Sequence, residues 1–365
     1  MKTLLSKPKQ EKHKDTTPEL LGEKLVYRYG KPFHYFKLGK SFSEGRTFMG
    51  HLGKSAKAFM TQAKRKNALI KVNQCPICGS RKSGPFLTRY GFNYRLCASG
   101  SCRHVFVANI INDKVRSSFF KKDFQYDNKN YCNPKISKFR LEEIAIPKVD
   151  FTMQFTSPSA DSWLDVGCGS GEILAALNSK KWSSVGLDLG GENVKFAKAN
   201  YGLDIKQKTL EEFIDETRDH FDVISFFGVI HCVRDPGILI RRAVSVLKPG
   251  GIVVVEIPHH ESIESSAVKS FPDHPSRSCY NGISTLHHFT RHSAHRLFTQ
   301  SGLIPEAVWF LGTDVYEILN QLCYASKQFV DSPLFGELIE LANELQLVID
   351  QKKRSSNMIW IARKA

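Results

Sequence analysis

The chain has 365 residues, of which 41% are hydrophobic and 11% aromatic, as in ordinary soluble proteins that bury a core. That length exceeds what one compact domain usually needs, so we expect a main domain and an accessory one. The lysine-rich residues 1–15 contain no apolar segment, which argues against a secretion signal, and no apolar run reaches the length of a membrane span. These features predict a cytoplasmic protein without a transmembrane segment.

The net charge of +16 is concentrated in residues 1–72, where 17 Lys and Arg face 5 Asp and Glu, against 35 and 31 in the rest of the chain. Such an excess favours nucleic acid, an anionic membrane surface or a phosphorylated substrate, or else forms a solvated, partly irregular arm. Within this basic arm, a sparse apolar pattern over 43–70 predicts an amphipathic helix. Membrane, RNA or the protein's own core could receive its apolar face.

A cysteine-rich module is predicted over 73–108, because four of the nine cysteines lie within 28 residues. Cys75, Cys78, Cys97 and Cys102 follow the pattern C-x2-C-x18-C-x4-C. Two such knuckles suit a closed, tetrahedral Zn²⁺ site that stabilises a small fold. The second spacing is wider than usual, which makes His104 a possible replacement ligand, and the alternative is a set of reduced, buried thiols. The odd number of cysteines argues against a disulfide framework.

A helical connector is expected over 109–157, with helices over 113–124 and 136–144, the second ending before Pro147. Residues 156–159 indicate a linker. After it, over 158–365, strands and helices alternate, which is typical of a parallel sheet covered on both faces. We expect strands near 161–166, 183–188, 203–206, 221–227, 251–257, 304–311 and 358–363, and helices near 170–179, 191–200, 209–216, 235–247, 291–301 and 314–350. The predicted fold class is α/β, a Rossmann-like, mostly parallel seven-stranded sheet with an N-terminal zinc module.

A glycine-rich turn follows the first of these strands. Gly167, Gly169 and Gly171 let the backbone pass close to a ligand, and the helix that begins there has free N–H groups that favour an anion. The next strand ends in Asp188, 17 residues past Gly171, where a ribose-hydroxyl acceptor belongs in such a fold. These features also suit an NAD-binding domain, and glycine turns occur for packing reasons alone. Asp165, two residues before the first glycine, is not required by the dinucleotide motif.

Later segments decide between these readings. LDVGCGSG, GLD, FDVISFFGVIHCVRDP and LKPGG, in this order over about 163–310, resemble the motifs of class I S-adenosylmethionine-dependent methyltransferases. The resemblance implies that Gly167, Gly169 and Gly171 line the amino-acid end of the cofactor. It further implies that Asp165 orients the loop or the ammonium group, that Asp188 holds the ribose hydroxyls, that Leu189 contacts the adenine with Leu210 or Glu211 beside it, and that Phe227 lies near the sulfonium. Residues 312–363 loosely resemble the closing segment of bacterial methyltransferases found with polysaccharide and natural-product genes.

Methyl transfer to an oxygen or carbon atom also calls for a base. His231 and His259 are expected at the carboxyl ends of two strands, where ligands bind in open α/β sheets, and Tyr280 is a weaker candidate. Each histidine could equally serve packing. Residues 259–289 are long and irregular enough to form a lid over a substrate. Cys168 has no neighbouring histidine in the sequence that would activate it.

Three functions are compatible with these observations. The first is a methyltransferase for a small molecule or glycan, such as a sugar nucleotide, a polysaccharide or a natural-product intermediate. The second is an RNA methyltransferase that holds RNA with the basic arm and the zinc module, although no recognised RNA-binding signature is present. The third is a non-catalytic scaffold that keeps the fold. The sequence does not indicate the acceptor or the oligomeric state.

Overall fold

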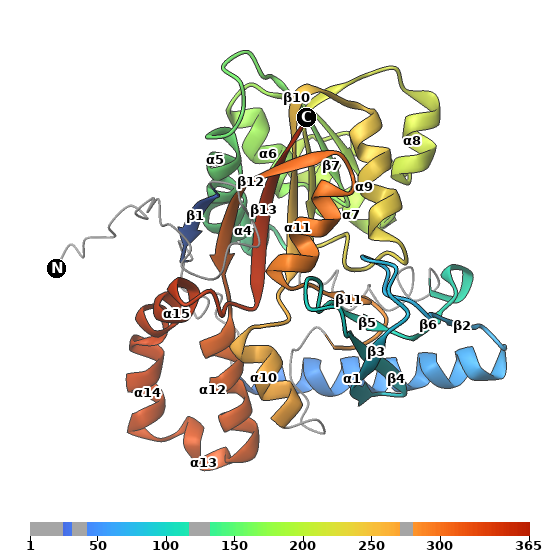
Figure 1. Cartoon of the computed structure of the whole chain (residues 1–365). Coiled ribbons are helices and arrows are strands. Elements are labelled where there is room, and N and C mark those ends of the chain that lie inside the picture. Colours follow the sequence, from blue (N-terminus) through green and yellow to red (C-terminus); the bar gives the residue numbers. More distant parts are fainter. Residues whose placement is uncertain (1–24, 31–41, 117–131, 271–279) are drawn as a thin grey trace.

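The computed structural model describes residues 25–30, 42–116, 132–270 and 280–365 (Figure 1). The strands are β1 (Val26–Tyr29), β2 (Leu69–Lys71), β3 (Ser83–Arg89), β4 (Phe92–Cys97), β5 (Val105–Val107), β6 (Asn109–Ile111), β7 (Ser162–Val166), β8 (Ser183–Leu187), β9 (Phe221–Phe227), β10 (Leu247–Pro258), β11 (His287–His288), β12 (Leu303–Leu311) and β13 (Asn357–Lys364). The helices are α1 (Phe42–Arg65), α4 (Pro134–Arg140), α5 (Ile146–Met153), α6 (Glu172–Ser179), α7 (Gly191–Tyr201), α8 (Leu210–Glu216), α9 (Pro236–Ser245), α10 (Ile263–Ser270), α11 (Arg291–Thr299), α12 (Asp314–Ala325), α13 (Lys327–Val330), α14 (Pro333–Glu340) and α15 (Ala342–Gln351).

The centre of the molecule is a seven-stranded sheet in the order β1-β12-β13-β10-β9-β7-β8. Strands β8, β7, β9 and β10 pair in parallel, and β13 is antiparallel to both of its neighbours. Since β1 pairs in parallel with β12, β13 is the one reversed strand of the sheet. The predicted α/β class with a mostly parallel seven-stranded sheet is therefore confirmed.

Two edges of this sheet differ from the sequence-based prediction. The strand expected over 203–206 is reduced to a single parallel bridge between Leu187 and Lys206. Its residues alternate between buried and exposed, but only Lys206 bonds to the edge strand, with its amide to Gly186 and its carbonyl to Asp188. At the opposite edge, β1 adds a strand that the basic arm was not expected to provide. The predicted total of seven strands was right, but the sheet contains β1 in place of the strand expected over 203–206.

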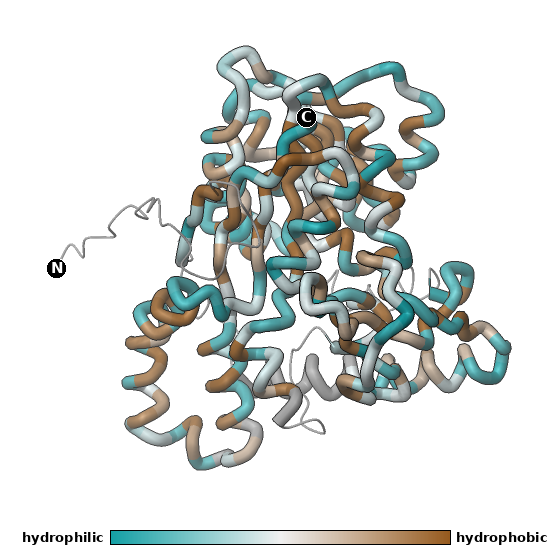
Figure 2. Tube along the Cα trace, in the orientation of Figure 1, coloured by the Kyte–Doolittle hydropathy of each residue, from teal (hydrophilic) through white to brown (hydrophobic). Residues whose placement is uncertain are grey.

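Helices cover both faces of the sheet, which makes three layers (Figure 1). One face packs against α8, α9 and α11, and the other packs against α5 and α6. Alternate residues of β13 enter the two cores: Trp360 faces the first and Ile361 the second. Figure 2 shows the apolar segments gathered in these strands, with hydrophilic segments at the outer turns. The helices predicted in this part of the chain are all present.

The cysteine-rich segment forms a smaller unit against the lower end of the sheet in Figure 1. Its four-stranded sheet has the order β11-β5-β4-β3, and β2 pairs with β6 beside it. Helix α1 buries Ala56, Met60 and Ala63 in a cluster with the β4 residues Phe92 and Tyr94. The apolar side of this helix is thus taken by the protein's own core. The division of the chain at 72, 108 and 157 stays a prediction.

The connector contains one continuous helical stretch where a break was predicted. Helix α4 leads through a π-helical turn, Leu141–Ala145, into α5, so the helix does not end before Pro147. The expectation failed because the amide of Ile146 bonds to the carbonyl of Leu141, and the wider turn lets proline stand near the start of a new helix. The other predicted helix is described at 113–116 only, and its remainder lies outside the described residues.

The helical stretch expected over 314–350 consists of α12 to α15, which form a cluster of their own around Val315, Leu319 and Cys323. In the segment 259–289, helix α10 and strand β11 are present although no regular element was predicted there; residues 271–279 lie outside the described residues. Within the described part of the chain, no helix combines the length and the apolar character needed to cross a bilayer.

Candidate functional site

The glycine turn lies between β7 and α6, at the carboxyl end of the parallel strands. Gly167, Gly169 and Gly171 all have positive φ angles, of 71°, 55° and 88°, which disfavour any residue with a Cβ. A Cβ at Gly167 or Gly171 would lie 2.5 Å from Val229 or 2.8 Å from Leu203, so these two also serve close packing. A Cβ at Gly169 would meet nothing within 4 Å. Gly169 therefore borders open space, as a backbone that approaches a ligand should.

Asp188 follows β8 and faces this turn. Its carboxylate accepts hydrogen bonds from the amides of Gly169 (2.9 Å) and Gly190 (2.8 Å) and from the side chain of Asn193 (3.1 Å). The carboxylate thus joins the glycine turn to the start of α7. Leu189, the next residue, is 57% exposed, which is unusual for leucine and leaves an apolar surface beside the carboxylate.

Leu210 lies elsewhere in this region. It begins α8 and is 2% exposed, packed in the core that includes Leu187 and Phe213. Any contact of its side chain with a ligand would require that core to open. Its predicted place beside the adenine is untested.

Asp165 is buried beneath the glycine turn. Ser225 donates to its carboxylate over 2.5 Å, and Trp163 donates to the Ser225 hydroxyl over 2.7 Å. Burial raises the pKa of Asp165 to about 7, while the Ser225 hydrogen bond and the nearby Lys148 oppose that rise. A carboxyl group held in this way gains from a cation placed close to it.

An ion pair that the sequence analysis missed lies beside Asp165. Lys148 of α5 reaches Glu256 of β10 over 2.7 Å and lies 4.9 Å from the ring centre of Phe227 at the end of β9. Both partners are largely buried, with side-chain exposures of 11% and 19%. An acid in the otherwise apolar run of β10, near the carboxyl end of a parallel strand, was the available signal for Glu256. Lys148 has no comparable signal, because its helix was expected to end before Pro147.

A second buried network fixes the glycine turn from the connector side. Glu172, at the start of α6, accepts from Ser170 (2.9 Å), Ser137 (2.6 Å) and Arg140 (3.3 Å). Since Ser137 and Arg140 belong to α4, the connector helix holds the turn in place. This role was also not predicted.

His231 lies in the turn after β9. Its ring nitrogen Nδ1 is buried and has no hydrogen-bond partner among the described residues. Burial lowers the pKa of His231 to about 4, and Glu256 partly opposes the shift, so the ring is neutral near pH 7. Its backbone carbonyl accepts from the amide of Leu286 over 2.8 Å, which fixes the segment before β11 next to it.

His259 has different surroundings. It is 1% exposed, and its Nδ1 donates to the carbonyl of Ser355 over 2.9 Å, while its backbone amide donates to Ser356. Its Nε2 lies 3.6 Å from the carboxylate of Glu261. These contacts tie the end of β10 to the segment before β13, which favours packing over catalysis.

The four predicted metal ligands are gathered at one point of the small unit. The sulfur atoms of Cys75, Cys78, Cys97 and Cys102 all lie within 4.8 Å of one another, with Cys75 and Cys102 3.8 Å apart. Four sulfurs around Zn²⁺ at about 2.3 Å would stand roughly 3.8 Å apart, so the cluster fits a tetrahedral metal. The Cys75–Cys102 hydrogen bond lowers the pKa of Cys75 and raises that of Cys102, so one sulfur of the pair readily forms the thiolate that metals bind. Among the described residues every cysteine is a free thiol.

His104 is not part of this cluster. Its ring is fully buried and contacts Ser293 (3.4 Å) through Nδ1 and His287 (3.1 Å) through Nε2. The four sulfurs thus account for the metal group, and His104 instead joins the small unit to β11 and α11. Tyr280 is placed in the same region: its ring stacks on His288 at 3.6 Å, and its hydroxyl group lies 2.9 Å from Ser265.

Comparison with known proteins agrees with this geometry. Residues 138–307 match the family model described as a methyltransferase domain. The ubiquinone biosynthesis O-methyltransferase of Caulobacter vibrioides is 36% identical over 97 residues, which is 25% of this chain and 38% of that protein. That of Stutzerimonas stutzeri is 28% identical over 123 residues, 32% of this chain and 53% of that protein. The chain thus spans about half, or less, of the length of these curated relatives.

Among solved structures, a SAM-dependent methyltransferase from Archaeoglobus fulgidus aligns over 67% of this chain and 100% of its own, with 16% identity and a TM-score of 0.42. The plantazolicin methyltransferase BamL, in complex with a triazolic desmethylPZN analog and SAH, aligns over 68% of this chain and 93% of its own, with 16% identity and a TM-score of 0.44. Scores this low carry no argument about the site.

Proposed function

We propose that this protein is an S-adenosylmethionine-dependent methyltransferase that acts on a small molecule or a glycan. The observation that carries the proposal is the set formed by the open glycine turn at Gly169, the Asp188 carboxylate and the exposed Leu189, within the residues that match a methyltransferase domain. These groups offer what an amino-acid end, a ribose and an adenine would need. The NAD-binding alternative does not explain the buried Asp165.

Different residues would bind different parts of the cofactor. The backbone of Gly167, Gly169 and Gly171 would receive the amino-acid end, and the Asp165 carboxyl, with its raised pKa, would become charged beside the ammonium group. Asp188 would exchange its bond to the Gly169 amide for the ribose hydroxyls, with Leu189 against the adenine. Phe227 would lie near the sulfonium, where the face of an aromatic ring attracts a cation. Leu210 would support this wall from within the core.

S-adenosylmethionine supplies the methyl group as an electrophile, so the chain mainly positions the acceptor and excludes water. The Lys148–Glu256 pair, largely buried and next to Phe227, would hold charge fixed at that point. His231 is the base we favour, because its Nδ1 is neutral and has no partner among the described residues. His259, already bonded through Nδ1, would serve position rather than proton transfer.

The acceptor class rests on two supports. The chain is similar over 97 residues to a ubiquinone biosynthesis O-methyltransferase, whose name indicates a small-molecule acceptor. Residues 312–363 loosely resemble the closing segment of bacterial methyltransferases found with polysaccharide and natural-product genes. RNA is the second candidate, favoured by the basic residues of the N-terminal part. We assign Zn²⁺, held by Cys75, Cys78, Cys97 and Cys102, a structural role, since four protein ligands leave no open position.

Calorimetric titration of the purified protein with S-adenosylmethionine, and separately with NADH, tests the cofactor. We expect binding of S-adenosylmethionine that Asp188→Ala weakens about tenfold or more, because a charged hydrogen-bond acceptor is lost. Asp219→Ala, at an exposed acid just before β9 and hence at the opposite end of the parallel strands, is the matched control and should bind normally. Binding of NADH instead would overturn the proposal, and binding of neither would leave a non-catalytic scaffold. Acceptors are then screened with sugar nucleotides first and RNA second.

A further inference from the structure

The small unit contains a long stretch without acidic residues. Residues 45–112 hold twelve Lys and Arg and no Asp or Glu. A folded segment of this length normally mixes both signs of charge, so its surface carries an unbalanced positive potential. Solvent and counterions alone would balance this charge. A cavity in the same segment indicates a specific ligand, because three of these cations line it.

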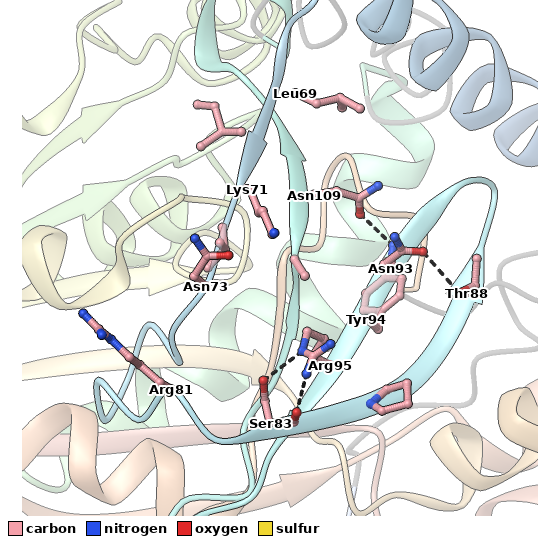
Figure 3. A pocket seen from close by; sticks show the side chains of 14 residues that line it. Leu69, Lys71, Asn73, Arg81, Ser83, Thr88, Asn93, Tyr94, Arg95 and Asn109 are labelled. Atoms are coloured by element: carbon pink, nitrogen blue, oxygen red, sulfur yellow. Dashed lines mark hydrogen bonds between the residues drawn. The ribbon is translucent and has the colours of Figure 1, made fainter.

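A pocket of about 650 Å³ lies between the β2–β6 pair and the β3–β4 hairpin (Figure 3). It is lined by Leu69, Ile70, Lys71, Val72, Asn73, Arg81, Ser83, Pro85, Thr88, Asn93, Tyr94, Arg95, Ala108 and Asn109. None of the fourteen is acidic. The volume is within the range of small-molecule sites, about 300–1,000 Å³.

Three cations from separate places in the chain line this pocket. Lys71 belongs to β2, Arg95 to β4, and Arg81 to the turn before β3. Among the described residues no carboxylate lies within ion-pair distance of any of them. Arg95 donates to the side chain of Ser83 over 2.8 Å and also to its backbone carbonyl, which fixes the guanidinium without neutralising it. Positive groups that line a cavity without a counter-charge favour an anionic ligand.

The other polar groups of the pocket are held in position. Asn109 accepts from the amide of Asn93 over 2.7 Å and donates to the carbonyl of Gly91 over 2.9 Å, while Thr88 donates to the side chain of Asn93 over 3.2 Å. Figure 3 shows the Asn93–Asn109 and Thr88–Asn93 bonds along one wall, between the β3–β4 hairpin and β6. Such a wall supplies hydrogen-bonding groups at fixed positions, which a defined ligand needs and a diffuse charged surface does not.

A chain of contacts that begins at Tyr94 links the pocket to the proposed active site. Tyr94 lines the pocket, and the ring of Tyr94 lies 5.2 Å from that of Tyr280 and 6.0 Å from that of His288. Tyr280 and His288 belong to the segment that follows β10, which is bonded to His231 through Leu286. One wall of the pocket therefore packs against the segment that contacts His231.

We propose that this pocket binds a phosphate ester or diphosphate group carried by the methyl acceptor, with Lys71, Arg81 and Arg95 as the recognising cations. The identification of the anion as part of the acceptor rests on the proposed function, whereas anion binding does not. Phosphate is favoured over a single carboxylate because three cations line the pocket. Binding of nucleic acid would require an extended row of such sites. RNA binding is one of the outcomes that the test distinguishes.

The test is a calorimetric titration of the zinc-loaded full chain with inorganic pyrophosphate. We expect binding that Lys71→Gln/Arg81→Gln weakens about tenfold or more, since each lost charged contact contributes strongly. Both replaced side chains are exposed, so folding is preserved. The matched control is Lys54→Gln/Lys64→Gln, which removes the same charge from exposed positions on α1 outside the pocket and should change binding by about twofold or less. Arg95→Lys, which retains the charge, should keep most of the affinity.

Equal weakening in the pocket variant and the control, or no binding by the wild-type chain, would overturn the proposal. So would tight binding of a short single-stranded RNA that both variants weaken alike, because the charge would then act as a broad surface. Each variant is also titrated with S-adenosylmethionine. If the wild-type chain does not bind S-adenosylmethionine, the proposed function is refuted, but the pyrophosphate result still stands.

Discussion

The glycine turn and the contact between the small unit and the segment after β10 are both parts of the candidate active site, but they differ in how the chain builds them. The turn is formed by residues 165–171 and 188, which are close in sequence and follow adjacent strands. The other region joins β5 to β11 and His104 to His287 across 183 residues. Local patterns specify the first region, and only the tertiary fold specifies the second. The predictions below test whether the two regions are as separable as this contrast implies.

The largest effect is expected at the metal cluster. Cys97→Ser removes one of four ligands, and a structural Zn²⁺ contributes about 10–16 kcal/mol of binding free energy that is coupled to folding. We expect loss of the bound zinc and of the hairpin β3–β4, with a large fall in thermal stability. Metal content per chain and a thermal melt measure this. Cys132→Ser, at a thiol outside the cluster, is the control, and a Cys97→Ser variant that kept one zinc per chain would contradict the assignment.

A smaller effect is expected where the segment after β10 packs on β4. Gly282 has φ of +70°, and a Cβ there would lie 2.1 Å from the ring of Phe92, which is fully buried. Gly282→Ala should therefore lower the free energy of unfolding by about 2–4 kcal/mol through overpacking and backbone strain. Gly302→Ala has nearly the same φ, +77°, but meets nothing within 4 Å, so chemical denaturation of the two variants isolates the packing term. Equal losses of unfolding free energy in the two variants would show that Gly282 is not tightly packed against Phe92.

A substitution in the glycine turn should have the opposite effect to Gly282→Ala: it should weaken cofactor binding more than it lowers stability. Gly169→Ala places a methyl group in open space, so it should weaken S-adenosylmethionine binding about tenfold or more while costing only the strain of its φ, about 1 kcal/mol. Gly202→Ala, at φ of +69° with nothing within 4 Å, carries the same strain at the end of α7 and should bind normally. Normal binding by Gly169→Ala would remove the turn from the cofactor site.

The two regions should also titrate with opposite signs. Burial lowers the pKa of His287 to about 4, below its value in the unfolded chain. Below pH 6.5 the unfolded chain therefore binds a proton that the folded chain refuses, and stability falls by about 1.4 kcal/mol per pH unit towards pH 4 for each such histidine. Urea unfolding at pH 7, 6 and 5 measures the slope, which His287→Gln should reduce. An unchanged slope would show that His287 is not held neutral.

The carboxyl of Asp165 is raised to a pKa of about 7, above its unfolded value. The folded chain then holds a proton that the unfolded chain has released, so this contribution is complete below about pH 4 and is lost as the pH rises through 7. Asp165→Asn should flatten the stability profile between pH 5 and 8. A profile of the variant parallel to that of the wild-type chain in that window would indicate that the carboxylate is ionised throughout.

The success of sequence reasoning follows the same division. The closeness of Asp188 to the glycine turn could be predicted because strand, turn and helix each have a local pattern that points to the same place. The clustering of the four cysteines could be predicted because thiol spacing is itself a pattern. Their predicted contacts with cofactor and zinc, like those of Leu189, Leu210 and Phe227, stay predictions.

What was missed depends on pairing between distant segments. Strand β1 has four residues and is specified by the edge of β12, and β11 has two and is specified by β5. The residues 203–206 have a strand-like alternation, yet the sheet edge accepts only a bridge. Lys148 became significant only when the helix continued through Pro147 and brought it to Glu256. In each case the energetically decisive partner lies far along the chain.

The pairing of β5 with β11 also has a consequence for synthesis. A ribosome adds about 5–20 residues per second, so roughly 10–40 s separate the emergence of His104 from that of His287. During that interval the cysteine knuckles can already capture a metal ion, while the outer edge of β5 has no neighbouring strand to cover it. An uncovered edge invites pairing with other chains. The small unit, although it comes first along the chain, would be among the last parts of the molecule to be completed.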